Sequence, residues 1–176
     1  MDYPWYELVA HDEPLQQRDI FFNCPIVSLP SVEPLLRAST LDSAVEWPEA
    51  LSIQIADIIV LTHSCDLVKP ELDRVMVCPH TDAMTLAPKR EQRSNIRKGR
   101  VLAYHLIESC DIDSYTFGQR VIDFRLLSPL PKRFLEEFSL QYGNRIRLLP
   151  PYREKMAQSF ANYFGRIGLP KDPRDI

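Results

Sequence analysis

Apolar residues occur in short runs over the first three-quarters of the chain, and these runs predict β-strands. The strongest run is 53–62 (IQIADIIVLT), which is rich in β-branched residues, and the next is 74–78 (RVMVC). We expect these two runs to be neighbours, with HSCDLVKPELD (63–73) between them as an exposed loop. Further strands are predicted at 19–23, 26–29, 101–107, 121–127 and 145–149.

Helical spacing of apolar residues is confined to the C-terminal part of the chain. It predicts a helix over 132–142, with Phe134, Leu135 and Phe138 facing inward. A second helix is predicted over 152–167, where one face carries a larger apolar stripe. That stripe consists of Met156, Phe160, Tyr163, Phe164 and Ile167.

Polar stretches separate these elements, and residues 30–50 and 89–100 are predicted to be loops. The chain has no internal repeat or low-complexity tract, so we expect a single domain over residues 1–176. Its fold class is predicted to be mostly β with α: a barrel-like body over about 15–128 and 145–149, plus the two C-terminal helices.

Composition places the chain in the globular class, with 45% hydrophobic and 26% charged residues in a length of 176. The longest apolar stretch, 55–61, is interrupted by Asp57 and is far shorter than the roughly 20 residues of a membrane span. Four cysteines are too few for a disulfide scaffold, and the N-terminus lacks a leader pattern. We therefore expect a cytoplasmic protein with no membrane association and no cofactor.

Charge is distributed unevenly. The net charge of -3 argues against general attraction to nucleic acid, but residues 89–100 (KREQRSNIRKGR) contain six basic residues and one acid. A polyanion such as RNA would be contacted there. The candidate nucleic-acid-binding residues are Arg18, Lys89, Arg90, Arg93, Arg97, Lys98 and Arg100.

The THSCD segment combines reactive side chains at the end of the strongest strand. Thr62, Ser64 and Cys65 are candidate nucleophiles, His63 is a candidate base or acid, and Asp66 is a candidate orienting carboxylate. The alternative is a polar turn in which Ser64 or Asp66 hydrogen-bonds the backbone.

Cysteine and histidine also offer nitrogen and sulfur ligands for zinc, at Cys24, His63, Cys65, Cys78 and His80. An antiparallel pairing of the two strongest strands would place His63 and Cys65 roughly 15 to 20 Å from Cys78 and His80. A complete four-ligand site is therefore not expected. Cys24 and Cys78 are predicted to be small buried side chains at strand ends, and a zinc or thiol site centred on Cys65 stays an alternative.

The run DIIVLTHSCDLVKPELDRVMVCPHTD resembles the corresponding core of the MazF/PemK toxin family, and DIFFN resembles that family's opening strand. The resemblance implies a small SH3-like barrel, with kinship to endoribonucleases and to gyrase poisons of the same fold. The segments RIRLLPPYREKMAQSFANYFGRIGLP and LTHSCDL also resemble a group of bacterial proteins, which implies no activity.

These observations are compatible with two main classes of function. The first is a nucleic-acid-directed barrel protein, either a toxin-like endoribonuclease of a toxin–antitoxin or defence system or a non-catalytic relative that binds RNA. In the enzyme, His63 would be the acid or base, Thr62 or Ser64 would position phosphate, and the cation would be Arg18, Arg97 or Arg100. The second is an interaction module that docks onto a partner protein through its C-terminal helix and exposed strand edges.

Overall fold

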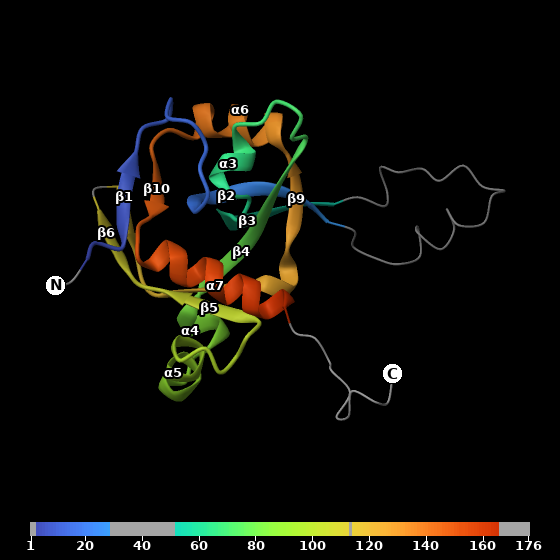
Figure 1. Ribbon diagram of the computed structural model, residues 1–176. Helices are drawn as coiled ribbons and strands as arrows, with labels where there is room; N and C mark the ends of the chain where they lie inside the picture. The colour runs from blue at the N-terminus through green and yellow to red at the C-terminus, as the bar shows by residue number, and fades with distance from the viewer. Residues whose placement is uncertain (1–2, 29–51, 113, 166–176) are drawn as a thin grey trace, which may run out of the picture.

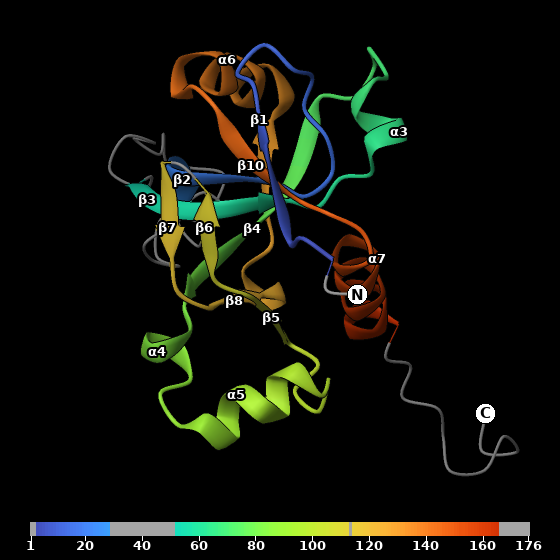
Figure 2. The same cartoon turned by 90° about the vertical axis from the view of Figure 1, so that its left-hand side faces the viewer.

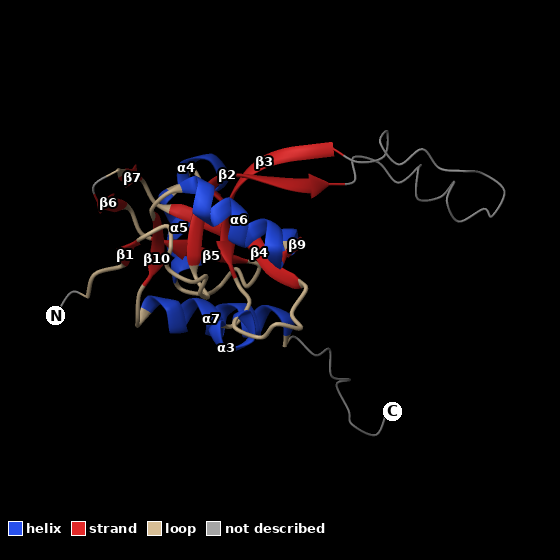
Figure 3. Ribbon diagram, turned by 90° about the horizontal axis from the view of Figure 1, so that it is seen from above, coloured by secondary structure: helices blue, strands red, loops and turns tan. Residues whose placement is uncertain are grey.

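The computed structural model describes residues 3–28, 52–112 and 114–165, and it is built mostly of antiparallel strands with several helices (Figure 1). The strands are β1 (Tyr6–Val9), β2 (Asp19–Ser28), β3 (Ser52–Val60), β4 (Arg74–Asp82), β5 (Tyr104–Ile107), β6 (Cys110–Ile112), β7 (Tyr115–Phe117), β8 (Arg120–Asp123), β9 (Ser128–Pro131) and β10 (Arg145–Leu148). The helices are α3 (Ser64–Leu67), α4 (Ala83–Leu86), α5 (Arg90–Arg97), α6 (Lys132–Tyr142) and α7 (Tyr152–Phe164), with a 3₁₀ turn, η1, at Phe124–Leu126. The predicted strand-rich class is confirmed, as the red strands in Figure 3 show.

The main sheet has the strand order β1-β10-β2-β3-β4-β8-β5, and β9 pairs with β4 beside this path. β6 and β7 form a separate two-stranded hairpin. Within the described part of the chain, the order begins at β1 and ends at β5 without a bond that joins them, so these strands form no closed barrel.

The predicted pairing of the two strongest strands is confirmed. β3 and β4 are antiparallel, with Ile59 opposite Cys78 and Val60 opposite Val77. These four side chains are fully buried. The loop between the strands therefore leaves the core at one end of the sheet.

The two strands predicted at 19–23 and 26–29 are one strand, β2, up to Ser28. Its register against β3 shifts between Phe21 and Cys24, and Asn23 has a positive φ of 56°. A β-bulge of this kind bends a strand without ending it. The predicted loop at 30–50 lies outside the described residues.

The C-terminal helices match the predictions at most positions. α6 has the predicted bounds and buries Leu135 completely, while Phe134 and Phe138 pack against the same core cluster. In α7, Met156 is fully buried, but Phe164 is 56% exposed and is not part of the inward face. Ile167 lies outside the described residues.

Two segments differ from the predictions because of local hydrogen bonds. The predicted loop 89–100 contains the helix α5. The predicted strand 121–127 ends at Asp123, whose carboxylate accepts a hydrogen bond from the Arg125 backbone N–H and starts the turn η1. Asp123 is buried and also forms an ion pair with Arg125.

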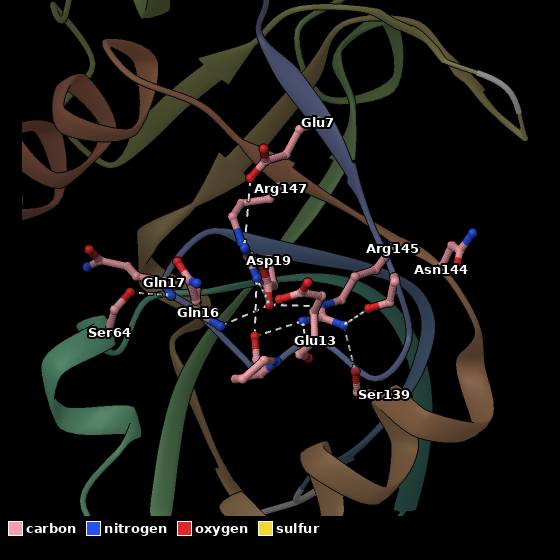
Figure 4. Close-up of polar contacts among 12 residues, drawn as sticks. Glu7, Glu13, Gln16, Gln17, Asp19, Ser64, Ser139, Asn144, Arg145 and Arg147 are labelled. Atoms are coloured by element: carbon pink, nitrogen blue, oxygen red, sulfur yellow. Dashed lines mark hydrogen bonds and ion pairs between the residues drawn. The ribbon is translucent and has the colours of Figure 1, made fainter.

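A buried ionic cluster joins the N-terminal segment to the sheet (Figure 4). Asp19 of β2 accepts hydrogen bonds from Arg145 Nε at 2.8 Å and from Arg147 Nε at 2.5 Å. The Arg145 guanidinium also donates to Ser139 of α6 and to the carbonyls of residues 10, 13 and 14. The cluster therefore holds β2, β10, α6 and the chain that precedes β2 in one arrangement.

Candidate nucleic-acid interface

The helix α5 projects from the end of the molecule opposite α3, as the views in Figures 1 and 2 both show. Its start is capped by Gln92, whose side-chain oxygen accepts a hydrogen bond from the Lys89 backbone N–H. Gly99, with a positive φ of 69°, follows its last turn. Ile96 is the buried residue of α5 and packs in a small cluster with Leu106 and Val121. Because Ile96 is the buried residue of α5, the other positions of the helix can carry charged side chains at the surface.

Three arginines of α5 surround one hollow on the surface. Arg90, Arg93 and Arg97 are spaced i, i+3 and i+7, which places them on one side of a helix, and they line a hollow of about 350 Å³ together with Ser94 and Gln119. The Arg93 guanidinium is held in place, because its Nη1 donates to the carbonyls of residues 87 and 88 at 2.8 and 2.7 Å. We call this hollow the arginine hollow.

The other basic residues of the segment flank the helix. Lys89, Lys98 and Arg100 are exposed, and Arg100 Nη1 donates to the Asn95 side chain at 3.2 Å. Arg97 pairs with Glu108, so one cation of the arginine hollow is partly neutralised. The six predicted basic residues of 89–100 therefore gather on α5 and at its two ends.

A larger cavity, of about 490 Å³, lies between α5, β5 and α7 and shares Arg97 with the arginine hollow. We call it the interhelical cavity. Its other charged lining residues are Lys98, Glu108 and Lys155. The remaining lining combines aromatic, apolar and neutral polar groups, among them Trp5, Tyr104, His105, Tyr152, Ser159 and Asn162.

The aromatic residues of this cavity come from distant parts of the chain. The Trp5 and Tyr152 rings stack with centroids 3.6 Å apart and an interplanar angle of 9°. The Arg125 guanidinium lies 4.9 Å from the centroid of the Tyr104 ring. Both interactions fix ring orientation in the cavity wall.

His105 and Ser159 are in contact inside the cavity, with Nδ1 and Oγ 3.0 Å apart. The Ser159 hydroxyl donates to the Lys155 carbonyl at 3.0 Å, so its single proton is already used and Nδ1–H is the donor to Oγ. This geometry is not that of a base activating a serine. Burial, followed by the charges of Lys155 and Arg18, lowers the pKa of His105 to about 4, so the imidazole is neutral near pH 7.

The predicted HSCD tip forms the short helix α3 rather than an extended loop. Its polar atoms hold the turn together: Thr62 Oγ1 accepts from the Met76 N–H at 2.7 Å, and Ser64 Oγ accepts from the Gln17 N–H at 3.1 Å. His63 Nδ1 accepts a hydrogen bond from the Cys65 N–H at 3.2 Å. These contacts are those of a polar turn.

Two charges of the tip pair with each other. Asp66 forms an ion pair with Lys69 at 2.6 Å, and this partner lowers the pKa of the Asp66 carboxyl. His63 and Cys65 are exposed. Because α3 and α5 lie at opposite ends of the molecule, the structure does not bring His63 near Arg97 or Arg100 (Figure 2).

Arg18 was expected to offer a cation to phosphate, but its side chain is buried, with 1% exposure. Its Nη1 lies 3.4 Å from the carbonyls of Val60 and Leu61, and its Nε has no hydrogen-bond partner among the described residues. Burial, and then the nearby Arg153, lower the pKa of Arg18 to about 10. From this position it cannot reach a surface ligand.

The candidate zinc ligands are dispersed. Cys24 and Cys78 are fully buried as expected, although they lie within β2 and β4 rather than at strand ends. Burial raises the pKa of both thiols to about 12. In residues 3–28, 52–112 and 114–165, no group of three or more His, Cys, Asp or Glu side chains is arranged to hold a metal ion.

A further polar cluster joins β3, β4 and β8. Arg120 Nε donates to His80 Nδ1 at 2.6 Å, and the same guanidinium pairs with Asp57. His80 is therefore occupied as an acceptor, and burial followed by the Arg120 charge lowers its pKa. Like the Asp19 cluster, this cluster has a structural role, because it links three strands through one arginine.

Sequence reasoning identified the basic segment and missed the cavity beside it. Lys155, Ser159 and Asn162 form a polar stripe on α7, one position before Met156, Phe160 and Tyr163 of the apolar stripe. That spacing is visible in the sequence. These residues line one cavity with β5 and Trp5 only after the chain has folded, so no local sequence pattern predicts that arrangement.

Comparisons with known proteins add no identification: no family model matches the chain, and no curated protein matches it. Among the helices that the structure describes, none has the length and hydrophobicity of a transmembrane span.

Proposed function

We propose that the protein binds single-stranded RNA, with α5 contacting the sugar–phosphate backbone. The observation that supports this function is the arginine hollow, in which Arg90, Arg93 and Arg97 surround one space. Guanidinium groups present a fork of N–H donors that matches phosphate oxygens. A hollow lined by three of them and by neutral Ser94 and Gln119 is suited to a phosphate.

The charge of its lining residues distinguishes the arginine hollow from a second hollow, which lies next to α6. That hollow combines Arg74, Lys132 and Arg133 with the acids Asp73 and Glu136, so its charges compensate each other. The arginine hollow has no acid in its lining, although Glu108 pairs with Arg97 nearby. A chain with a net charge of -3 thus concentrates a positive patch in one place, which favours a local polyanion contact.

The choice of RNA over DNA rests on the resemblance to the MazF/PemK family. We extend the proposal to the fold: the open antiparallel sheet is a relative of the SH3-like barrel of that family. The proposed activity is binding, because the reactive residues of the α3 tip lie far from the arginine hollow (Figure 1).

Salt-dependent binding tests the function. Fluorescence anisotropy would be measured with a labelled single-stranded RNA of about 12 nucleotides at several salt concentrations. We expect Arg90→Gln/Arg97→Gln to weaken binding and to reduce the slope of log K against log salt by about 1.4, because two phosphate contacts are lost. A single-stranded DNA of the same sequence shows whether the 2′-hydroxyl contributes.

The matched control is Arg74→Gln/Arg133→Gln, which removes the same charge from exposed positions at the hollow next to α6. Its slope should equal that of the wild type. If the wild type shows no salt-dependent binding, or if both double variants weaken it equally, the proposed function is wrong and the interaction-module hypothesis gains. RNA cleavage that is lost in His63→Ala would restore the enzyme hypothesis instead.

A further inference from the structure

The interhelical cavity and the arginine hollow are adjacent, because the side chain of Arg97 lines both. A phosphate held in the arginine hollow would therefore leave the attached nucleoside at the cavity mouth. The cavity volume of about 490 Å³ falls within the usual range for small-ligand sites.

The cavity lining combines aromatic and cationic side chains. Trp5, Tyr104 and Tyr152 provide aromatic rings in the wall, and the cations Lys98 and Lys155 are exposed. An unpaired base has a π-face that stacks on such rings whatever its sequence. A phosphate would favour the cationic residues over the aromatic wall.

Three polar side chains of the lining are neutral: His105, Ser159 and Asn162. His105 and Ser159 are paired with each other, and Asn162 accepts a hydrogen bond from Gln158 Nε2 at 2.9 Å, which leaves its own N–H groups available. The acid Glu108 is already bound by Arg97 and by Gln119 Nε2. These groups suit the hydrogen-bonding edge of a base.

We propose that the interhelical cavity takes up one unstacked base of the bound strand, with its phosphate in the arginine hollow. This inference rests on the proposed function, which it extends from backbone contact to base contact. It makes the protein a binder of single strands in particular, because a base inside a duplex cannot enter the cavity.

The fluorescence of Trp5 reports on the cavity directly. The chain has two tryptophans, so Trp47→Phe leaves Trp5 as the only one. We expect oligouridylate to quench Trp5 emission. An abasic oligomer of the same length carries the same phosphates without bases, and it should bind at least about fivefold more weakly and leave the emission unchanged.

A cavity variant with a matched control completes the test. Asn162→Leu fills the cavity rim on α7, whereas Ala161→Leu places the same side chain at an exposed position of the same helix outside the cavity lining. Asn162→Leu should lower the affinity for oligouridylate toward that for the abasic oligomer, while Ala161→Leu should retain the difference.

The outcomes separate the two proposals. Suppose that both oligomers bind equally, that neither changes Trp5 emission, and that the arginine-dependent salt slope persists. The uptake of a base by the interhelical cavity is then refuted, while the backbone contact at the arginine hollow stands. If neither oligomer binds, the proposed function fails and the base pocket fails with it.

Discussion

Asp19 and Arg145 form an ion pair in which neither side chain is exposed to solvent, with Arg145 Nε 2.8 Å from the carboxylate. Removing two charges from water is costly, and the cost is offset only where the remaining donors are also bonded. Arg145 meets this condition, since its terminal nitrogens donate to three backbone carbonyls and to Ser139. The pair therefore orders the chain before β2 as well as the sheet.

The first prediction concerns this pair. Asp19→Asn leaves Arg145 buried without a carboxylate partner, while Arg147 keeps its ion pair with Glu7 at 3.8 Å. We expect the free energy of unfolding in urea to fall by about 3 to 5 kcal/mol, because one arginine stays buried and uncompensated. The matched control is Asp12→Asn, at an exposed position of the same N-terminal segment, which should change stability by less than about 0.5 kcal/mol. Equal stability of both variants would contradict the assigned role.

The second prediction is a pH dependence caused by His105. Its pKa is about 4 in the folded protein and near 6.5 when unfolded, so the unfolded chain binds more protons between these values. The contribution of neutral His105 to the free energy of unfolding is complete above pH 6.5 and is lost as the pH falls toward 4. We expect His105→Gln to lose about 2 kcal/mol less stability than the wild type between about pH 7 and pH 5. Parallel pH profiles would disprove this, and His80 contributes in the same direction to both proteins.

The third prediction concerns the four cysteines. Cys65 is exposed, whereas Cys24, Cys78 and Cys110 are buried and burial raises the pKa of each of these three thiols. A maleimide should therefore modify one thiol per native chain rapidly and four in denaturant, as counted by mass spectrometry. Cys65→Ser should remove the rapid phase. Rapid modification of a second cysteine would show that the native core opens there.

The fourth prediction tests whether Arg18 is separate from the proposed nucleic-acid interface. Because its guanidinium is buried with only long hydrogen bonds, Arg18→Met should leave the free energy of unfolding unchanged or raise it by up to about 4 kcal/mol. The RNA affinity should stay within about twofold of the wild type, since no phosphate contact is lost. A reduced salt slope in this variant would instead place Arg18 at the RNA.

The sequence predicted the elements whose pattern is repeated over many residues. The β3–β4 pairing was predictable because both segments are runs of apolar and β-branched residues, and the bounds of α6 were predictable because its apolar positions recur with helical spacing. α5 was missed because a single apolar residue, Ile96, anchors it, and one residue defines no period. β8 was predicted too long because a cap at Asp123 competed with the alternating pattern.

The charged residues show a second limit. Arg145 and Arg147 lie in an ordinary strand pattern, and their burial depends on Asp19, which is more than a hundred residues earlier in the chain. The clustering of basic residues in 89–100 was predictable from the sequence, but the interhelical cavity was not. Its walls come from Trp5, from the 96–108 segment and from α7, which meet only after folding.

The helix α5 lies in a segment between two strands, so the proposed recognition element is separate from the sheet that carries it. The chain leaves the sheet at the end of β4 and re-enters it at β5, and both of these strands pair with β8. A segment inserted between such fixed points, with Ile96 as the buried residue of its helix, can exchange its surface residues without altering the strand order. Related chains could thus bind other ligands through substitutions in the segment between β4 and β5, while the sheet stays the same.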